Sequence, residues 1–275
     1  MIQLQKLGFA YSSKTILFNN LNLSLHEGSI VGVLGKNGAG KSSLMKMIAG
    51  LLSPQEGTLS VLGYTPSARV PSFLQEVFLL PEEPETPSLS IQEYIQAYSP
   101  FYPNFDLNLL EESLRVFELS IGTHLKKLSY GQKKKFMIAF ALASRCRLII
   151  MDEPTNGLDI PSKKAFKKLM AGTMNDDQLL LLSTHQINDI ESLIDQVVVL
   201  DEGKVVYHKG MYQLSKELAF ALVPSLEGRE VLYSEESVGG YKVITPNQKM
   251  DTPVDLELLF NALMKNPNKL DHENN

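Results

Sequence analysis

The sequence lacks three features that would place the chain in an oxidising compartment or a membrane. Its one cysteine, Cys146, excludes an intrachain disulfide and fits a reducing compartment. No stretch approaches the roughly 18 uninterrupted apolar residues that a membrane-spanning helix needs. The N-terminal residues also lack the apolar run of a secretory signal. We therefore expect a cytoplasmic chain without direct membrane insertion, which would reach a membrane only through another protein.

The chain also lacks an excess of basic residues. It carries 26 Lys and Arg against 31 Asp and Glu, a net charge of -5, so overall charge does not indicate nucleic-acid binding. What the chain has is 44% hydrophobic residues over 275 positions, which can form a sizeable core. One large domain, or one domain with an appendage, fits this length. Cys146 lies beside an expected strand, so we expect a buried structural thiol.

Short apolar segments alternate with turns or helical segments over much of the chain. The expected strands are Ile16–Leu25, Ile30–Leu34, Thr58–Leu62, Leu148–Met151, Leu179–Ser183, Val197–Leu200 and Val205–Tyr207. Asp201–Lys204 is the turn of a hairpin between the last two. Helices are expected from Lys41 onward and in both segments that link the strands at 148–151, 179–183 and 197–200. This alternation predicts an α/β fold with a largely parallel sheet wrapped by helices.

The segment from Pro81 to about Leu142 has helical patterns instead. We expect helices over Leu89–Tyr98, Leu109–Leu119 and Gln132–Ala143, inserted between two halves of the α/β core. The Lys133–Lys135 run is interpreted as a solvated helix start rather than a nucleic-acid patch.

The pattern changes again after Gly210. Arg229–Ser234 and Tyr241–Thr245 predict a hairpin across Gly239-Gly240. Thr252 as N-cap and Pro253 at the first helical position predict the start of a terminal helix. Its apolar stripe is Leu256, Leu259, Phe260 and Leu263, which indicates packing onto its own domain; binding to a partner is the alternative. Residues 266–275 are polar and expected to fray.

One segment matches the phosphate-binding pattern G-x-x-x-x-G-K-[ST] at every fixed position. It reads Gly35, Lys36, Asn37, Gly38, Ala39, Gly40, Lys41 and Ser42, followed by Ser43. The glycines let backbone N–H groups wrap the phosphates, and the following helix adds its positive dipole. Lys41 is predicted to reach the β- and γ-phosphates, and Ser42 to bind Mg²⁺. A nucleotide site is therefore expected here.

A second motif, a pair of acidic residues, follows the expected strand at 148–151. Asp152 and Glu153 follow it directly, at the edge where open α/β sheets place ligands. Asp152 suits the Mg²⁺ shell. Glu153 suits polarisation of the attacking water, because phosphoryl transfer depends on positioning and charge stabilisation. Solvated acids at a strand end are the alternative, and the preceding nucleotide-binding motif argues against it.

Between these motifs lies Leu128-Ser129-Tyr130-Gly131-Gln132. In this order the motifs resemble those of the ATP-binding cassette (ABC) ATPases over roughly residues 1–210, and the five-residue run resembles their LSGGQ motif. Ser129, Gly131 and Gln132 match, whereas Tyr130 replaces the first glycine. The resemblance implies that Ser129 contacts the ATP of a second copy of the domain.

The resemblance implies further positions. Asp159, in Thr155–Asp159, resembles the loop aspartate at the dimer interface. His185 resembles the switch histidine that contacts the γ-phosphate, and it is counted with Glu153 and Lys41 as catalytic. Tyr11 resembles the aromatic residue that stacks on adenine. Taken alone, His185 would be interpreted as structural, and Tyr11 as a residue of the core or of the surface.

One position departs from the family pattern. The family has a glutamine after Leu-Pro that senses Mg²⁺ and faces the transmembrane partner, and Glu82 stands in its place here. Glutamate can still bind Mg²⁺ directly or through water. Similar Pro-Glu-Glu runs occur in ATPases that resemble the ABC-2 type exporters.

The resemblance implies a fold and a function for the whole chain. The fold is a P-loop NTPase cassette with a mostly parallel core sheet and an N-terminal antiparallel β part, over residues 1–210. It includes a helical subdomain at about 82–142, and residues 211–275 form a small C-terminal extension. That extension is a structural cap, a regulatory element or a dimer contact.

The implied function is that of the ATPase subunit of a transporter. Two copies would form a homodimer around two ATP molecules with Mg²⁺ and drive a separate permease, for export, at the inner face of the cell membrane. The alternative is a non-transport ABC ATPase acting on DNA or the ribosome, although those relatives generally carry long coiled-coil insertions or two cassettes. A small-molecule kinase would not explain the run at 128–132 or His185.

Overall fold

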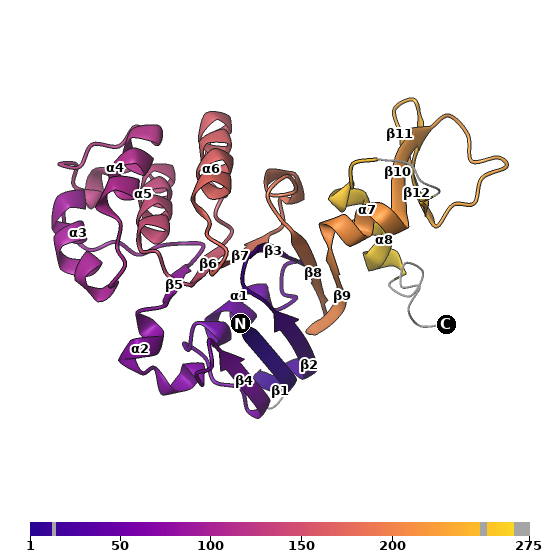
Figure 1. The fold of residues 1–275 in the computed structure, drawn as a ribbon. Coiled ribbons are helices and arrows are strands. Elements are labelled where there is room, and N and C mark those ends of the chain that lie inside the picture. Colours follow the sequence, from indigo (N-terminus) through magenta and orange to yellow (C-terminus); the bar gives the residue numbers. More distant parts are fainter. Residues whose placement is uncertain (13–14, 248–251, 267–275) are drawn as a thin grey trace.

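The computed structural model describes residues 1–12, 15–247 and 252–266. A six-stranded sheet in the order β5-β6-β7-β3-β8-β9 lies at its centre (Figure 1). The strands are β3 Ser29–Leu34, β5 Val77–Leu80, β6 Leu148–Asp152, β7 Leu179–Thr184, β8 Gln196–Asp201 and β9 Lys204–Gly210. All neighbouring pairs are parallel except β8 and β9, which form the expected hairpin. The predicted α/β sheet is confirmed.

An antiparallel sheet of three strands forms the N-terminal part. It has the order β2-β1-β4, with β1 Ile2–Ser12, β2 Thr15–Leu25 and β4 Glu56–Val61. The sequence pattern named no strand at β1. Its inward alternation breaks at Lys6, whose φ is 49°, and the pairing register with β2 shifts between Leu4 and Leu7. The bulge therefore hides the period of two that marks a strand.

The described residues form eight α-helices. They are α1 Lys41–Ile48, α2 Pro71–Leu74, α3 Ile91–Tyr98, α4 Leu107–Val116, α5 Tyr130–Ala143, α6 Ile160–Thr173, α7 Met211–Glu217 and α8 Leu256–Lys265. The caps decide where α3, α4 and α5 begin. The side chains of Ser90, Asp106 and Ser129 each accept a hydrogen bond from the backbone N–H three residues later. The three expected helices exist, with starts shifted by two residues.

The helix expected between β7 and β8 is wrong. The segment contains only a three-residue 3-10 helix, Ile187–Asp189. Ile187, Ile190 and Ile194 from this segment are nevertheless buried. Asp195 ends the segment by accepting a hydrogen bond from the N–H of Ile30, at 2.8 Å. The helix-like spacing of these isoleucines thus reflects their burial and not a regular helix.

The C-terminal part contains a third sheet, in the order β10-β12-β11. Its strands are β10 Leu218–Val223, β11 Tyr233–Ser237 and β12 Gly240–Pro246, all antiparallel. The predicted hairpin exists, but its first strand begins at Tyr233 rather than Arg229. Strand β10 was not expected.

The predicted start of the terminal helix is wrong. Helix α8 begins at Leu256, and the Asp255 side chain caps it by accepting a hydrogen bond from the N–H of Leu258 at 2.9 Å. Thr252 instead accepts from the N–H of Phe220, at 3.0 Å. Thr252 therefore does not cap the helix, because its hydroxyl is bound to the backbone of β10 instead. The expected frayed tail, apart from Asn266, lies outside the described residues.

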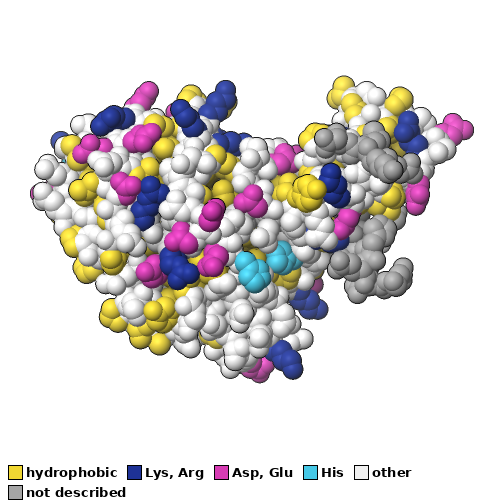
Figure 2. All heavy atoms as spheres, in the orientation of Figure 1, with side chains coloured by type: hydrophobic (Ala, Val, Ile, Leu, Met, Phe, Trp, Pro, Cys, Tyr) yellow, Lys and Arg dark blue, Asp and Glu magenta, His cyan; other side chains and the backbone are white. Residues whose placement is uncertain are grey.

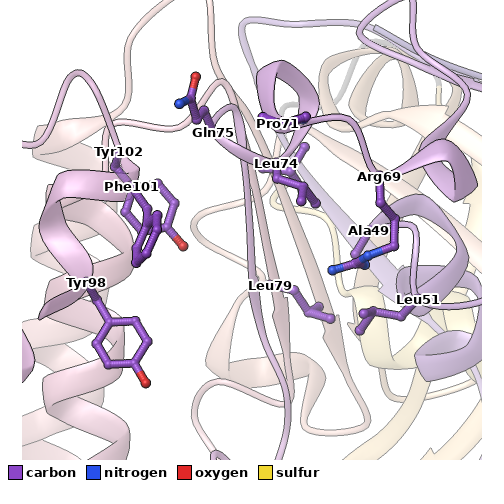
Figure 3. Close-up of a pocket in the computed structure, with 11 residues that line it drawn as sticks. Ala49, Leu51, Arg69, Pro71, Leu74, Gln75, Leu79, Tyr98, Phe101 and Tyr102 are labelled. Atoms are coloured by element: carbon purple, nitrogen blue, oxygen red, sulfur yellow. The ribbon is translucent and has the colours of Figure 1, made fainter.

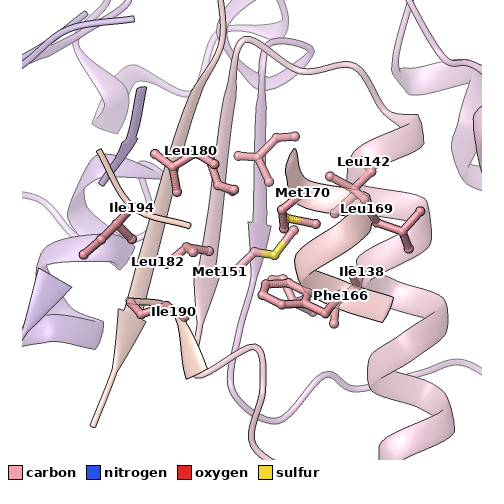
Figure 4. Close-up of a cluster of buried hydrophobic side chains, with 14 of the residues drawn as sticks. Ile138, Leu142, Met151, Phe166, Leu169, Met170, Leu180, Leu182, Ile190 and Ile194 are labelled. Atoms are coloured by element: carbon pink, nitrogen blue, oxygen red, sulfur yellow. The ribbon is translucent and has the colours of Figure 1, made fainter. Parts of the chain in front are cut away.

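The largest hydrophobic cluster packs helices against the central sheet. Figure 4 shows Met151 of β6 and Leu180 and Leu182 of β7 facing side chains of α5 and α6. The α8 stripe also joins this cluster, since Leu256, Leu259 and Leu263 are fully buried. Packing of α8 onto its own chain is therefore confirmed. No helix among the described residues is long and apolar enough to cross a membrane.

Candidate nucleotide site

The phosphate-binding loop connects β3 to α1 and depends on two glycines. Gly38 and Gly40 have φ angles of 85° and 105°, in the left-handed region that disfavours other residues. A Cβ at Gly40 would lie 2.7 Å from the ring of Phe18, so a side chain is excluded there. The loop backbone can therefore turn tightly into the N-terminus of α1, which is a geometry suited to phosphate.

Lys41 is buried at the base of this loop. Its Nζ donates hydrogen bonds to the carbonyl oxygens of Gly35, at 2.7 Å, and Lys36, at 3.2 Å. Burial lowers the pKa of Lys41, while the nearby carboxylates of Glu153, Asp152 and Glu82 act in the opposite direction. The loop thus holds the ammonium beside three acidic groups, where a phosphate would complete its hydrogen bonds.

The carboxyl ends of β6 and β7 place two acids at the same edge. Asp152 is the register partner of Ser183, and the Ser183 hydroxyl donates a hydrogen bond to its carboxylate. The N–H of Glu153 donates to the Ser183 carbonyl at 3.1 Å. Glu153 adopts φ 47°, which turns the chain sharply after the strand. Ser183 therefore fixes both acids through hydrogen bonds across the sheet.

The side chain of Glu153 is held by two further groups. Its Oε2 accepts from the Thr184 hydroxyl at 3.1 Å, and its Oε1 lies 2.8 Å from Nδ1 of His185. Glu153 is 6% exposed, whereas the His185 side chain is half-exposed. A buried carboxylate fixed in this way can orient a water molecule, and the open face of His185 remains available to a phosphate.

These side chains surround a pocket of about 280 Å³. Its lining is Tyr11, Leu17, Asn37, Gly38, Gly40, Lys41, Ser42, Ser43, Glu82, Asp152 and Glu153. Leu17 was not expected, and its strand pattern gives no signal for a pocket position.

Ser183 and Thr184 were also missed as supports, although they directly precede His185. Gly35, Lys36, Asn37 and His185 line a neighbouring hollow of about 240 Å³. Ala39 is buried in the N-terminal core.

The oxygen donors of the pocket fit Mg²⁺ bound with a nucleotide. Mg²⁺ is usually held by one or two carboxylates together with substrate phosphates. Ser42, Asp152 and Glu82 supply a hydroxyl and two carboxylates. Within the described ranges, no three His, Cys, Asp or Glu side chains form a metal site by themselves. The ion would therefore depend on the phosphates, whose charge it would neutralise.

Tyr11 borders the pocket from the end of β1. Its hydroxyl lies 2.8 Å from that of Ser43, and its ring meets Phe9 edge-on with centroids 4.9 Å apart. The side chain is 60% exposed, so its ring has a free face. This placement suits stacking on a base.

Ser129, Gly131 and Gln132 do not line the pocket of their own chain. Ser129 and Gln132 instead form a capping box at the start of α5, with N···O distances of 3.0 and 3.2 Å. Asp159 caps α6, because its carboxylate accepts hydrogen bonds from the Ser162 hydroxyl and, at 2.9 Å, from the Ser162 N–H. Both bonds lower the pKa of Asp159. Ser129, Gln132 and Asp159 are exposed, whereas Gly131 is half-buried.

The interpretation of Lys133–Lys135 as a solvated helix start is wrong at its middle residue. Lys134 is fully buried, because α5 turns it toward the carbonyl of Glu82. Lys133 and Lys135 are half-buried. Cys146 meets its expectation: it is 1% exposed, and burial raises the pKa of its thiol to about 12.

A further hollow, which we call the apolar groove, lies between the end of α1, α2, β5 and the end of α3. It has a volume of about 420 Å³. Figure 3 shows Tyr98, Phe101 and Tyr102 on one wall and Ala49, Leu51 and Arg69 on the other, with Leu79 between them. Phe101 and Leu51 are 64% and 53% exposed, which is unusual for large apolar side chains gathered in one place.

The surface charge is mixed on the face shown in Figure 2. Acidic and basic side chains are interspersed there, and hydrophobic side chains gather near α2. This face carries no broad basic area of the kind that nucleic-acid binding needs.

A phosphate-binding loop facing two carboxylates at the end of parallel strands defines a P-loop nucleotide-binding protein. The family described as ABC transporter matches residues 18–156, which is just over half of the chain. The chain therefore belongs to the ABC transporter family, as its ATP-binding component.

Known proteins agree with this assignment. The ABC transporter ATP-binding protein YtrB of Bacillus subtilis is 26% identical, over 95% of this chain and 97% of the relative. The Nod factor export ATP-binding protein I of Rhizobium etli is 27% identical, over 84% of this chain and 75% of the relative. A solved ATP-binding subunit of an ABC transporter is 27% identical with a TM-score of 0.71, covering 78% of this chain and 91% of that one.

Proposed function

We propose that this chain hydrolyses ATP with Mg²⁺ as one of two identical subunits that drive a separate membrane permease. Residues 1–210 are the ATPase domain, with residues 82–142 as its helical subdomain, and residues 211–275 are an extension. The protein then acts in the cytoplasm, at the inner face of the cell membrane. The direction is export, which the name of the Rhizobium etli relative supports.

The observation that carries the hydrolytic part is the setting of Glu153. Its buried carboxylate is held by Thr184 and His185 at the edge of the pocket that contains Lys41. A carboxylate in that position can orient a water toward a γ-phosphate held by Lys41. Tyr11 would stack on the base, while Ser42, Asp152 and Glu82 would hold Mg²⁺.

The proposal of two identical subunits rests on the place of Ser129. It lies outside the pocket of its own chain and is exposed at the N-terminus of α5, where a helix dipole favours an anion. A second copy can bring a γ-phosphate to this position, with Asp159 near the shared surface.

The substitution Ser129→Arg tests the split site. The bulky side chain should prevent the ATP-dependent dimer while leaving ATP binding to the single subunit unchanged. Sedimentation with ATP measures the dimer, and nucleotide titration measures binding. Ser120→Arg, at another exposed serine of the helical region, is the control. An unchanged dimer in Ser129→Arg would contradict the assignment.

The apolar groove supplies the contact with the permease. Its walls expose Phe101, Leu51 and Tyr98, so a short amphipathic segment from a cytoplasmic permease loop can bury them. The groove floor includes Leu79 of β5, and β5 leads within two residues to Glu82 at the nucleotide pocket. A permease segment bound in the groove would therefore contact β5, the strand that leads to the nucleotide pocket.

Isolation of the native protein from gently solubilised membranes tests this function. We expect a polytopic membrane protein to be isolated with it. Isolation with ribosomes or DNA instead would favour the alternative, a non-transport ATPase of the same family. Transport into or out of vesicles that contain the isolated complex then decides the direction.

A further inference from the structure

One carbonyl oxygen, that of Glu82, accepts two hydrogen bonds from the same helix. The hydroxyl of Tyr130 donates to it at 2.8 Å, and Nζ of Lys134 donates to it from the next turn of α5. Glu82 follows β5 and lines the nucleotide pocket. The first turns of α5 are thus bound to the main chain of a residue at the nucleotide site.

Lys134 is an unusual residue for this contact, because its side chain is fully buried. Burying an ammonium group is unfavourable unless hydrogen bonds and opposite charges compensate. Burial lowers the pKa of Lys134 to about 8, against the attraction of Glu82, Asp152 and Glu153. An apolar side chain would pack there without this penalty. The hydrogen bond from the buried amine to the Glu82 carbonyl offsets part of this penalty.

Tyr130 extends the contact to the loop that follows β6. A Cβ at Gly157 would lie 2.4 Å from the Tyr130 ring, so only glycine allows the ring to rest there. A Cβ at Gly131 would likewise lie 2.6 Å from the Gly157 carbonyl. Nδ2 of Asn156 in turn donates to Oε1 of Glu82 at 2.9 Å. The main chain and the carboxylate of Glu82 are therefore held from two sides.

We propose that Tyr130 and Lys134 are positioning residues that bind the segment after β5 to α5. These two bonds would hold the main chain of Glu82, so that its carboxylate stays at the edge of the nucleotide pocket of the same chain. This role rests on the proposed function, because α5 is also the helix whose N-terminus carries Ser129, the residue that we propose contacts the second copy. The tyrosine that replaces the family glycine thereby links the two half-sites of one subunit.

Hydrogen–deuterium exchange of the full chain without nucleotide tests this link directly. Tyr130→Phe removes one hydroxyl and keeps the ring, and Lys134→Met keeps the length of the side chain without the amine. Each should raise exchange in β5, residues 77–80, by about two- to tenfold, because the amides of β5 are paired with β6 and the strand loses one of the bonds that hold the segment after it. Lys133→Met, one residue earlier, is the matched control and should leave it unchanged.

A second measurement separates positioning from packing. In both variants the Mg²⁺ concentration for half-maximal ATP hydrolysis should rise, while the affinity for ATP without Mg²⁺ stays constant. Unchanged exchange in residues 77–80 in Tyr130→Phe would overturn the proposal, even if Lys134→Met failed to fold. Because exchange needs neither hydrolysis nor a permease, its result stands apart from the test of the proposed function.

Discussion

The nucleotide pocket and the apolar groove share the segment from Val77 to Glu82, yet opposite kinds of residue form them. The pocket combines buried charges with left-handed glycines, as at Lys41, Glu153 and Gly40. The groove has exposed aromatic and aliphatic side chains, such as Phe101 and Leu51. This difference fits the proposal that ATP is hydrolysed in the pocket and that the permease binds at the groove. Substitutions should therefore affect one function without the other.

The largest effect should come from Glu153→Gln. In the proposed mechanism the Glu153 carboxylate orients the attacking water, so its loss should lower ATP hydrolysis by about 10²- to 10⁴-fold. ATP binding and association with the permease should persist. A steady-state phosphate-release assay measures this, with the exposed Glu83→Gln as control. Near-normal hydrolysis would remove Glu153 from the catalytic role.

A smaller effect on the same pocket is expected from Lys41→Ala. Loss of a charged hydrogen bond removes roughly 1.5–3 kcal/mol, so ATP affinity should fall by about 10- to 100-fold. Lys46→Ala, on the exposed side of α1, should leave affinity unchanged. Titration with a fluorescent ATP analogue distinguishes the two. Equal affinity in both variants would contradict the assigned phosphate contact.

The groove should respond in the opposite way. Phe101→Asp places a charge where we expect an apolar permease segment, and an interface anchor of this kind contributes about 2 kcal/mol, or roughly 30-fold in affinity. Less membrane protein should be isolated with the variant, although ATP hydrolysis by the free subunit stays normal. Tyr212→Asp, equally aromatic and exposed but on α7, is the control. Equal loss in both variants would mean that the groove has no special role.

Local sequence signals predicted the parts of this protein that local physics controls. The glycines at 38 and 40 and the acids at 152 and 153 stand where the pattern placed them, because a phosphate-binding loop and a strand end depend on nearby residues. Local signals failed where distant contacts competed. Thr252 was expected to begin a helix, yet its hydroxyl binds the backbone of Phe220.

The candidate site shows the same division. The sequence named Lys41, Glu153 and His185, but it gave no sign that Ser183 or Thr184 supports the two acids. That support depends on the register between β6 and β7, which adjacent residues do not encode. The prediction that Lys134 is exposed was wrong for a related reason. Lys134 is buried because α5 packs against the segment after β5, which lies far away in the sequence.

The sequence by itself determined the nucleotide-binding class, the α/β fold and the family, because each depends on fixed spacing within short segments. The tertiary structure alone decided that Lys134 is buried, that the main chain of Glu82 is bound to α5, and that an apolar groove borders β5. These features arise where segments far apart in the chain meet, and their contacts depend on packing rather than on local residue patterns.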